Sequence, residues 1–222
     1  MKRVLGIIPA RSGSKGIKDK NIIDINGKPL IAYTIKEAKK SKIFDKILVS
    51  TDSQKIKKIS EFYGAEVPFL RPKYLAKDST PTYPVIKDVV NKFFKLTKIK
   101  YDYIFILQPT SPLRKSIHIR ESYTLLKNSY YANTLVSCQK VPHNFIPEKL
   151  MLKKNNKLAI IKNYKKLNNV NRKIKYDYYA RNGSAIYITT PEILKKSILS
   201  NKTILYEMDK IASLDIDNFI DL

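Results

Sequence analysis

The fold expected for this chain is decided by the stretch Val4-Leu5-Gly6-Ile7-Ile8-Pro9-Ala10-Arg11-Ser12-Gly13-Ser14-Lys15-Gly16. Its first five residues are apolar and predict a buried strand, and the residues after Pro9 break into a loop of glycine, serine and basic side chains. Such a loop can turn backbone N–H groups toward an anion while Arg11 and Lys15 supply positive charge. It has neither the spacing of a Walker loop nor the glycine fingerprint of dinucleotide folds, so taken alone it could equally be an ordinary strand-to-helix turn.

Strand and helix patterns alternate along the rest of the 222 residues, which favours one α/β domain (1–222) with a mostly parallel, twisted sheet covered by helices on both faces. From residue 141 to 179 the periodicity weakens, which leaves a flexible insertion and a subunit-pairing element both open. Apolar runs predict strands over 4–8, 46–50, 65–69, 103–107, 134–138, 185–189 and 203–208, and helical spacing predicts helices from Pro29 and over 53–63, 85–96, 117–126 and 191–198.

Composition narrows the class of protein. The sequence contains no apolar run of transmembrane length and no signal-peptide pattern at its start, so we expect a cytoplasmic protein without membrane insertion. The single cysteine, Cys138, excludes an internal disulfide and lies in a strand pattern, which favours a buried, inert thiol. The net charge of +24 is spread along the whole chain, which favours solvated faces over a specific nucleic-acid site.

Six motifs occur in order along the chain, and the first begins within the opening strand. They are IIPARSGSKGIKDKN at 7–21, VSTD at 49–52, LRP at 70–72, LQPTSPLR at 107–114, RNGSAIYI at 181–188 and SLDID at 213–217. This pattern resembles the acylneuraminate cytidylyltransferases, the CMP-sialic acid synthetases and their relatives that act on legionaminic and pseudaminic acids. The resemblance covers essentially the whole chain and implies a Rossmann-like nucleotidyltransferase fold, with residues 141–179 as a dimerisation insertion that overhangs the sugar site.

The resemblance also implies an activity. The chain would transfer CMP from CTP to the anomeric hydroxyl of a nonulosonic acid and release pyrophosphate, as a homodimer that uses Mg²⁺ or, in its place, Mn²⁺. N-acetylneuraminate is the first candidate acceptor, and legionaminic or pseudaminic acid is the alternative. Enzymes for eight-carbon keto sugars fit less well because their first loop differs from RSGSKG. A basic nucleic-acid-binding protein would explain the charge but not the ordered motifs.

The motifs carry over to individual residues of the nucleotide site. The resemblance assigns Arg11 and Lys15 to the triphosphate as catalytic cations and Arg71 to the cytosine ring. For Thr80 and Thr82, which follow Arg71, capping of the next helix competes with a role at the base. The nucleotide-binding set implied by the resemblance is Ala10, Arg11, Gly13, Ser14, Lys15, Lys20, Asn21, Arg71, Thr80 and Thr82.

A second set of residues is assigned to the acceptor sugar by resemblance. Arg172 stands at the family's spacing from Asn182, where an arginine would meet the sugar carboxylate. Ser184 is inserted relative to the common form of the motif, and Arg181 replaces a residue that is usually not basic. Arg114 is expected to anchor its loop. The implied sugar-binding residues are Gln108, Thr110, Ser111, Arg172, Asn182 and Tyr187.

Asp215 and Asp217 are the candidate metal ligands and also belong to the predicted catalytic set. One residue separates them, so on an extended segment both side chains point to the same side. Paired carboxylates are hard oxygen ligands of the kind that Mg²⁺ selects, although such pairs are often surface charge. The SLDID match favours the metal site, and either aspartate could also assist deprotonation of the acceptor hydroxyl.

Three further polar residues have structural interpretations. Asp52 precedes a helix and is expected to act as its N-cap more than as a ligand contact. His118 and His143 show no metal-ligand spacing with each other or with Cys138, so His118 is assigned to a helix surface and His143 to the insertion.

Overall fold

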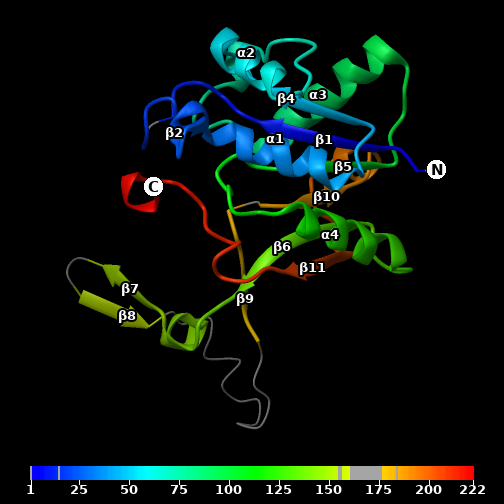
Figure 1. Cartoon of the computed structure of the whole chain (residues 1–222). Helices are drawn as coiled ribbons and strands as arrows, with labels where there is room; N and C mark the ends of the chain where they lie inside the picture. The colour runs from blue at the N-terminus through cyan, green and yellow to red at the C-terminus, as the bar shows by residue number, and fades with distance from the viewer. Residues whose placement is uncertain (1, 15, 155–156, 161–176, 184) are drawn as a thin grey trace.

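A computed structural model describes residues 2–14, 16–154, 157–160, 177–183 and 185–222. Its main sheet has seven strands in the order β11-β6-β10-β5-β1-β4, and β9 pairs with β6 beside this path (Figure 1). Strand β10 runs antiparallel to both of its neighbours, whereas β1 pairs in parallel with β4 and β5, and β11 in parallel with β6. The strands are β1 Val4–Pro9, β4 Lys46–Ser50, β5 Tyr103–Ile106, β6 Thr134–Lys140, β9 Tyr179–Arg181, β10 Tyr187–Thr189 and β11 Thr203–Glu207.

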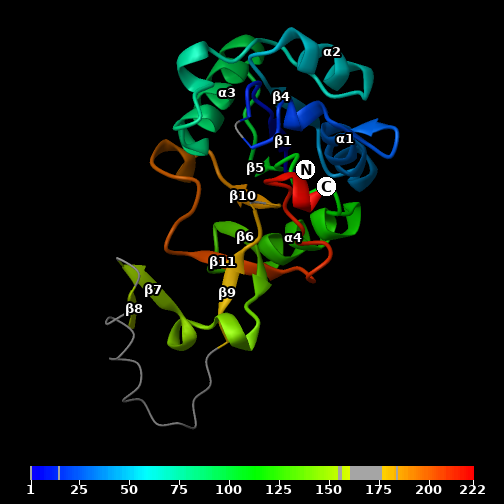
Figure 2. The same ribbon diagram turned by 90° about the vertical axis from the view of Figure 1, so that its left-hand side faces the viewer.

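Both faces of strand β1 are buried, because its side chains alternate between two apolar clusters. Val4 and Ile8 belong to the cluster that also contains Ile31 of α1, whereas Leu5 and Ile7 belong to a cluster on the other face. Figure 2 shows α1 and α3 on opposite sides of the strands β1 and β5. The expected fold class, a mostly parallel α/β sheet covered on both faces, is therefore confirmed.

Among the described residues, four α-helices cover the sheet. They are α1 Leu30–Ser41, α2 Gln54–Phe62, α3 Thr82–Thr97 and α4 Ser116–Asn128. Helix α2 starts after Ser53, whose hydroxyl accepts a hydrogen bond from the Ile56 N–H at 3.4 Å. The expected N-cap role of Asp52 is therefore wrong, because its neighbour caps the helix. Helix α3 begins at Thr82, earlier than predicted, with Pro81 as its N-cap.

Two predicted elements of the core differ in the structure. Residues 65–69 do not form a strand: Glu66 alone makes an isolated parallel bridge to Leu48, and Pro68 close by has no N–H to extend a ladder. The predicted helix over 191–198 is reduced to the 3₁₀ turn Ile193–Lys195. The carbonyl of Lys195 accepts hydrogen bonds from the Tyr83 hydroxyl at 2.7 Å and the Lys87 ammonium at 2.9 Å, which takes the place of a continuing helical bond.

The described part of residues 141–179 contains short 3₁₀ turns (His143–Phe145 and Pro147–Lys149) and a two-stranded ribbon, β7 Met151–Lys154 and β8 Lys157–Ile160. This ribbon lies away from the main sheet in both views (Figures 1 and 2). A second ribbon, β2 Asp24–Ile25 and β3 Lys28–Pro29, follows the first loop and the 3₁₀ turn Lys20–Ile22. Its turn residues Asn26 and Gly27 have φ of 49° and 74°, the conformation that Asn-Gly turns favour. The chain ends in the 3₁₀ turn Phe219–Asp221.

Candidate active site

A cleft of about 510 Å³ opens at the carboxyl ends of β1 and β5. This is the edge at which open α/β sheets bind ligands. Segments from the whole length of the chain meet there: the first loop, the loop before α3, the loop after β5 and the C-terminal segment. The cleft is lined by Pro9, Arg11, Ser14, Gly16, Lys20, Asn21, Arg71, Asp78, Thr80, Thr82, Val85, Gln108, Thr110, Gly183, Asp215 and Asp217.

The first loop is held in shape by side chains that come from other elements. Asp52, after β4, accepts hydrogen bonds from the backbone N–H of Ser12 at 2.8 Å and from its hydroxyl at 2.5 Å. Burial raises the pKa of the Asp52 carboxyl, but the two hydrogen bonds from Ser12 outweigh it and bring the pKa below its ordinary value. Asn21 is buried and donates to the carbonyl of Arg11 at 2.8 Å. The loop is thus preorganised with its basic side chain beside the cleft.

Arg11 and Asp78 form an ion pair within the cleft, and both side chains are partly exposed. Arg11 also donates to the carbonyl of Gly13 at 2.8 Å. The Asp78 carboxylate therefore neutralises the Arg11 guanidinium in a cleft that other basic side chains also line. Such an arrangement can exchange Asp78 for another anion, such as a phosphate oxygen.

Arg71 is buried at one wall of the cleft. Its Nε donates to the Ser50 hydroxyl at 3.1 Å and its Nη2 to the Ser50 carbonyl at 2.6 Å, which fixes the guanidinium against the end of β4. Burial lowers the pKa of Arg71 to about 10, although the charge of Asp52 opposes that change. Thr80 and Thr82 line the same wall. Neither threonine is the cap of α3, because Pro81 holds the N-cap position.

The C-terminal segment also lines the cleft. The N–H of Ile216 donates to the carbonyl of Thr110 at 2.8 Å, and the Ile216 side chain is buried with Ile17 and Leu30. Lys20 donates to the Ile216 carbonyl at 2.8 Å and to the Asp217 carboxylate at 3.1 Å. Ile216, anchored in this way, lies between Asp215 and Asp217 in the chain and so fixes both aspartates beside the cleft.

Two glycines let the chain approach this acidic segment closely. A Cβ on Gly16 would lie 2.6 Å from the backbone oxygen of Asp217. A Cβ on Gly183, whose φ is +57°, would overlap the carboxylate of Asp215. The position of both aspartates therefore depends on glycine at these sites.

The two aspartates have different environments. Asp217 is 72% exposed and paired with Lys20, whereas Asp215 is half-buried and its Oδ1 has no hydrogen-bond partner among the described residues. Burial raises the pKa of Asp215; a hydrogen bond from Thr110 partly opposes this, and the charge of Asp217 adds to the rise. An unpaired buried carboxylate oxygen beside a second carboxylate is a site that a cation would stabilise. Within the described ranges no group of three or more His, Cys, Asp or Glu residues is placed to hold a metal, so any ion here would rely on this pair and on other oxygen ligands.

A second cleft, of about 480 Å³, adjoins the first and shares Thr82 and Gln108 with it. Tyr187 of β10 and Arg181 of β9 form part of its wall, together with Tyr83 and the segment Lys196, Ser197, Ile198 and Leu199. The two clefts therefore form adjoining compartments of one site.

Arg114 anchors the loop after β5, as expected. Its side chain is buried, and it donates to the carbonyls of Gln108 at 3.1 Å and Ala185 at 2.7 Å and to the Thr34 hydroxyl at 2.6 Å. Burial lowers the pKa of this guanidinium, and the charge of Glu37 opposes that change. Arg114 thus joins α1, the loop after β5 and the segment before β10.

Most residues expected at the site line one of the two clefts, but four do not. Ala10 and Ser111 are buried, and Gly13 shapes the first loop with a φ of 64°. Asn182 is also buried: it accepts from Ser137 at 2.8 Å and donates to Ser213 at 2.9 Å, so it ties β6 to the C-terminal segment instead of facing the cleft. These hydrogen bonds give Asn182 a structural role.

Two further expected residues, Lys15 and Arg172, lie outside the described residues. Asp78 and Gly183 line the first cleft although the motifs did not assign them to it, whereas Arg181, expected beside the acceptor pocket, lines the second. For Gly183 a signal existed, since the RNGSAIYI motif contains it. His118 is half-buried at the start of α4, where its Nδ1 accepts from the Lys115 N–H at 3.2 Å, and Cys138 is buried as expected.

Comparison with known proteins identifies the family. The family model described as cytidylyltransferase matches residues 5–215. The chain belongs to the cytidylyltransferase family. Relatives of this chain include an N-acylneuraminate cytidylyltransferase of Escherichia coli, 34% identical over 99% of this chain and 50% of the relative. They also include the post-translational flagellin modification protein B of Campylobacter coli, 32% identical over 100% of this chain and 92% of the relative.

A CMP-N,N'-diacetyllegionaminic acid synthase of Legionella pneumophila is 42% identical over 56% of this chain and 53% of its own length. The chain spans about half the length of several of the curated relatives that it matches. Among solved structures, a CMP:2-keto-3-deoxy-manno-octonic acid synthetase complexed with CTP has the same fold. Its TM-score is 0.70 at 15% identity, over 97% of this chain and 93% of that one. In the described part of the chain, no helix is long and apolar enough to cross a membrane.

Proposed function

We propose that this cytidylyltransferase transfers CMP from CTP to the anomeric hydroxyl of a nonulosonic acid and releases pyrophosphate. Membership of the family supports the use of CTP. The names of its relatives, which include an N-acylneuraminate and a diacetyllegionaminic acid enzyme, support an acidic nine-carbon sugar as the acceptor. The observation that carries the proposal is the pair of adjoining clefts, because the reaction needs a polyanion and a sugar side by side.

In the proposed reaction the first cleft holds CTP. The first loop supplies Arg11 and a set of backbone N–H groups that are suited to phosphate oxygens. Arg71, Thr80 and Thr82 also line the cleft and supply donors and acceptors suited to the cytosine ring. Positioning and charge stabilisation account for most of the catalysis of such transfers, so these contacts would lower the barrier without a covalent intermediate.

We propose that Asp215 and Asp217 hold Mg²⁺, which Mn²⁺ can replace. The unpartnered Oδ1 of Asp215, the raised pKa of that carboxyl and the neighbouring carboxylate of Asp217 all favour a cation at this place. When bound, the ion would neutralise phosphate charge and acidify the acceptor hydroxyl. Either of the two carboxylates could also accept the proton of that hydroxyl.

The second cleft is the proposed acceptor site. Gln108 faces both compartments, and Tyr187 and Arg181 add an aromatic wall and a cation that suits the sugar's carboxylate. In-line attack requires the hydroxyl and the α-phosphorus to meet where the clefts join, beside Gln108 and Thr82. N-acetylneuraminate, legionaminic acid and pseudaminic acid are the candidate acceptors.

Pyrophosphate release tests this function directly. The purified protein is incubated with CTP, Mg²⁺ and each candidate nonulosonic acid, with an eight-carbon keto acid as the control acceptor. We expect pyrophosphate and a CMP-sugar in equal amounts with at least one nonulosonic acid. Release that does not depend on any acceptor would indicate a hydrolase, and no release at all would leave only nucleotide binding.

Arg11→Ala should lower turnover about a hundredfold, since loss of one preorganised electrostatic contact costs on the order of 3 kcal/mol. The matched control is Lys55→Ala, an exposed lysine of α2 that lies outside both clefts. Near-wild-type turnover of Arg11→Ala at saturating CTP would contradict the assignment of Arg11 to the phosphates.

We further propose that the protein works as a homodimer in the cytoplasm, where CTP is made, in the synthesis of cell-surface glycans. The ribbon β7–β8 lies away from the main sheet, and a paired copy would give it a surface to pack on. Light scattering on the purified protein is expected to give twice the chain mass. A strict monomer at micromolar concentration would overturn the dimer.

A further inference from the structure

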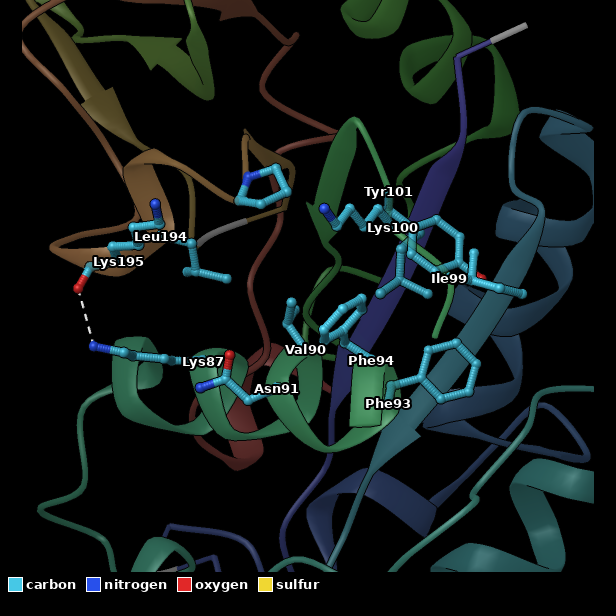
Figure 3. A pocket seen from close by; sticks show the side chains of 12 residues that line it. Lys87, Val90, Asn91, Phe93, Phe94, Ile99, Lys100, Tyr101, Leu194 and Lys195 are labelled. Atoms are coloured by element: carbon cyan, nitrogen blue, oxygen red, sulfur yellow. Dashed lines mark hydrogen bonds between the residues drawn. The ribbon is translucent and has the colours of Figure 1, made fainter. Parts of the chain in front are cut away.

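A separate pocket of about 350 Å³ lies beside the C-terminal half of α3, outside both clefts of the site. Figure 3 shows Val90 and Phe94 of α3 directed into it, with Ile99 on one side and Leu194 on the other. The walls are mostly apolar. A volume of this size falls in the range of small-molecule sites and is far too small for a helix or a second protein chain.

The charged residues of this pocket all have the same sign. They are Lys87, Lys100 and Lys195, and no carboxylate is among the described residues that line it. The ammonium of Lys87 is engaged by the Lys195 carbonyl at 2.9 Å and the Tyr83 hydroxyl at 3.1 Å. Lys100 and Lys195 are exposed and make no ion pair within the described part of the chain, and Lys100 reaches toward the Leu194 side in Figure 3. An apolar space with free ammonium groups complements an apolar molecule that carries one negative charge.

The pocket is physically connected to the second cleft. Tyr83 lines that cleft and donates its hydroxyl to the carbonyl of Lys195, the carbonyl that Lys87 also contacts. The residues after Lys195, from Lys196 to Leu199, form another part of the same cleft. A ligand that packs on Leu194 and pairs with Lys195 therefore acts on a turn whose next residues border the proposed acceptor site.

We propose that this pocket is a second ligand site, which takes a small amphipathic anion such as an alkyl or aryl carboxylate and changes the affinity of the second cleft for its occupant. The binding of the anion stands on the pocket alone. The coupling rests on the proposed function, since it concerns the acceptor. Charge selects the ligand's head group, and apolar burial supplies the affinity.

Binding is tested with decanoate below its micellar range, by displacement of the fluorescent anion anilinonaphthalene sulfonate. One saturable site is expected, and CTP should not displace the dye. Decanol and decylamine should bind at least tenfold more weakly than decanoate. The exposed Asn91 lines the pocket, so Asn91→Trp should fill it and weaken decanoate at least tenfold.

A second variant tests whether the lysine charges contribute to binding and leaves the pocket unfilled. The double variant Lys100→Glu and Lys195→Glu should weaken decanoate about tenfold. Its matched control is Lys95→Glu, an exposed lysine of α3 that does not line the pocket and should leave binding unchanged. Absence of a saturable site, equal binding of decylamine, or unchanged binding in folded Asn91→Trp would each overturn the site.

Coupling is measured as the KM of the acceptor at saturating decanoate, with the KM of CTP measured in parallel. The acceptor KM should change at least twofold and the CTP KM should stay constant. A constant acceptor KM would overturn the coupling. If no acceptor supports transfer, the proposed function fails, whereas the dye titrations still decide whether the pocket binds its anion.

Discussion

Replacement of Gly183 by alanine isolates the role of Asp215 in the cleft. Gly183 has a φ of +57°, and a Cβ there would overlap the Asp215 carboxylate. The left-handed conformation costs a residue with a Cβ roughly 1–2 kcal/mol, which lowers the melting temperature of a domain of this size by about 2–8 °C. The clash adds a displacement of the carboxylate, and a misplacement of about 1 Å at a reacting centre can cost about a hundredfold in rate.

Gly27→Ala provides the matched control. Gly27 has a φ of +74°, and a Cβ there would meet nothing within 4 Å. Gly27→Ala is therefore destabilised by the left-handed backbone conformation alone, without a steric clash. Thermal melts should show a loss for both variants, larger in Gly183→Ala because of the added clash, and pyrophosphate release should fall about a hundredfold in Gly183→Ala alone. Equal turnover of the two variants would refute the reasoning, because it would show that the reaction does not need Asp215 in this position.

Three further perturbations test other parts of the site. Asp215→Asn should raise the melting temperature of the metal-free protein at neutral pH. The pKa of the Asp215 carboxyl is raised in the folded state, so ionisation of this carboxyl opposes folding as the pH rises above the ordinary carboxyl range. The gain in melting temperature should therefore vanish below about pH 4. Pairs of melts across pH would reveal the opposite sign if the carboxylate were instead stabilised. Arg114→Met should cost about 3 kcal/mol in urea unfolding because it leaves buried acceptors unpaired, whereas the exposed Arg120→Met should change little. Asp78→Asn should tighten CTP binding about twofold to fivefold in calorimetry, since it frees Arg11 from a partly exposed pair; weaker binding would mean that Asp78 supports Arg11.

The parallel core could be predicted because its strands are buried on both faces. Residues 46–50 match β4, and the apolar run at 4–8 falls within β1, which ends at Pro9. Such runs leave little choice of structure. The antiparallel direction of β10 could not be predicted, because pairing is set by contacts between segments far apart in the chain. The turn at 193–195 likewise depends on side chains of α3, which no local pattern around Lys195 reveals.

The cleft was predictable where a motif combines a sharp backbone change with charge. Arg11 and Lys20 fit that description, since Gly13 and Asp19 beside them have positive φ, and both line the cleft together with the paired aspartates of the SLDID motif. Asn182 shows the limit of motif reasoning, since its amide is used inside the protein, between Ser137 and Ser213. A motif indicates that a residue belongs near the site, but it does not tell whether the side chain faces the ligand or the protein core.

The origin of the transferred phosphorus tests the central claim most directly. CTP labelled at the α-phosphate and CTP labelled at the γ-phosphate are each incubated with the protein, Mg²⁺ and a nonulosonic acid, and the products are separated. Metal-dependent CMP transfer predicts α-label in the CMP-sugar, γ-label in pyrophosphate, and neither product when the metal is chelated. Label from the γ-phosphate on the sugar, or CMP formed without sugar, would contradict CMP transfer.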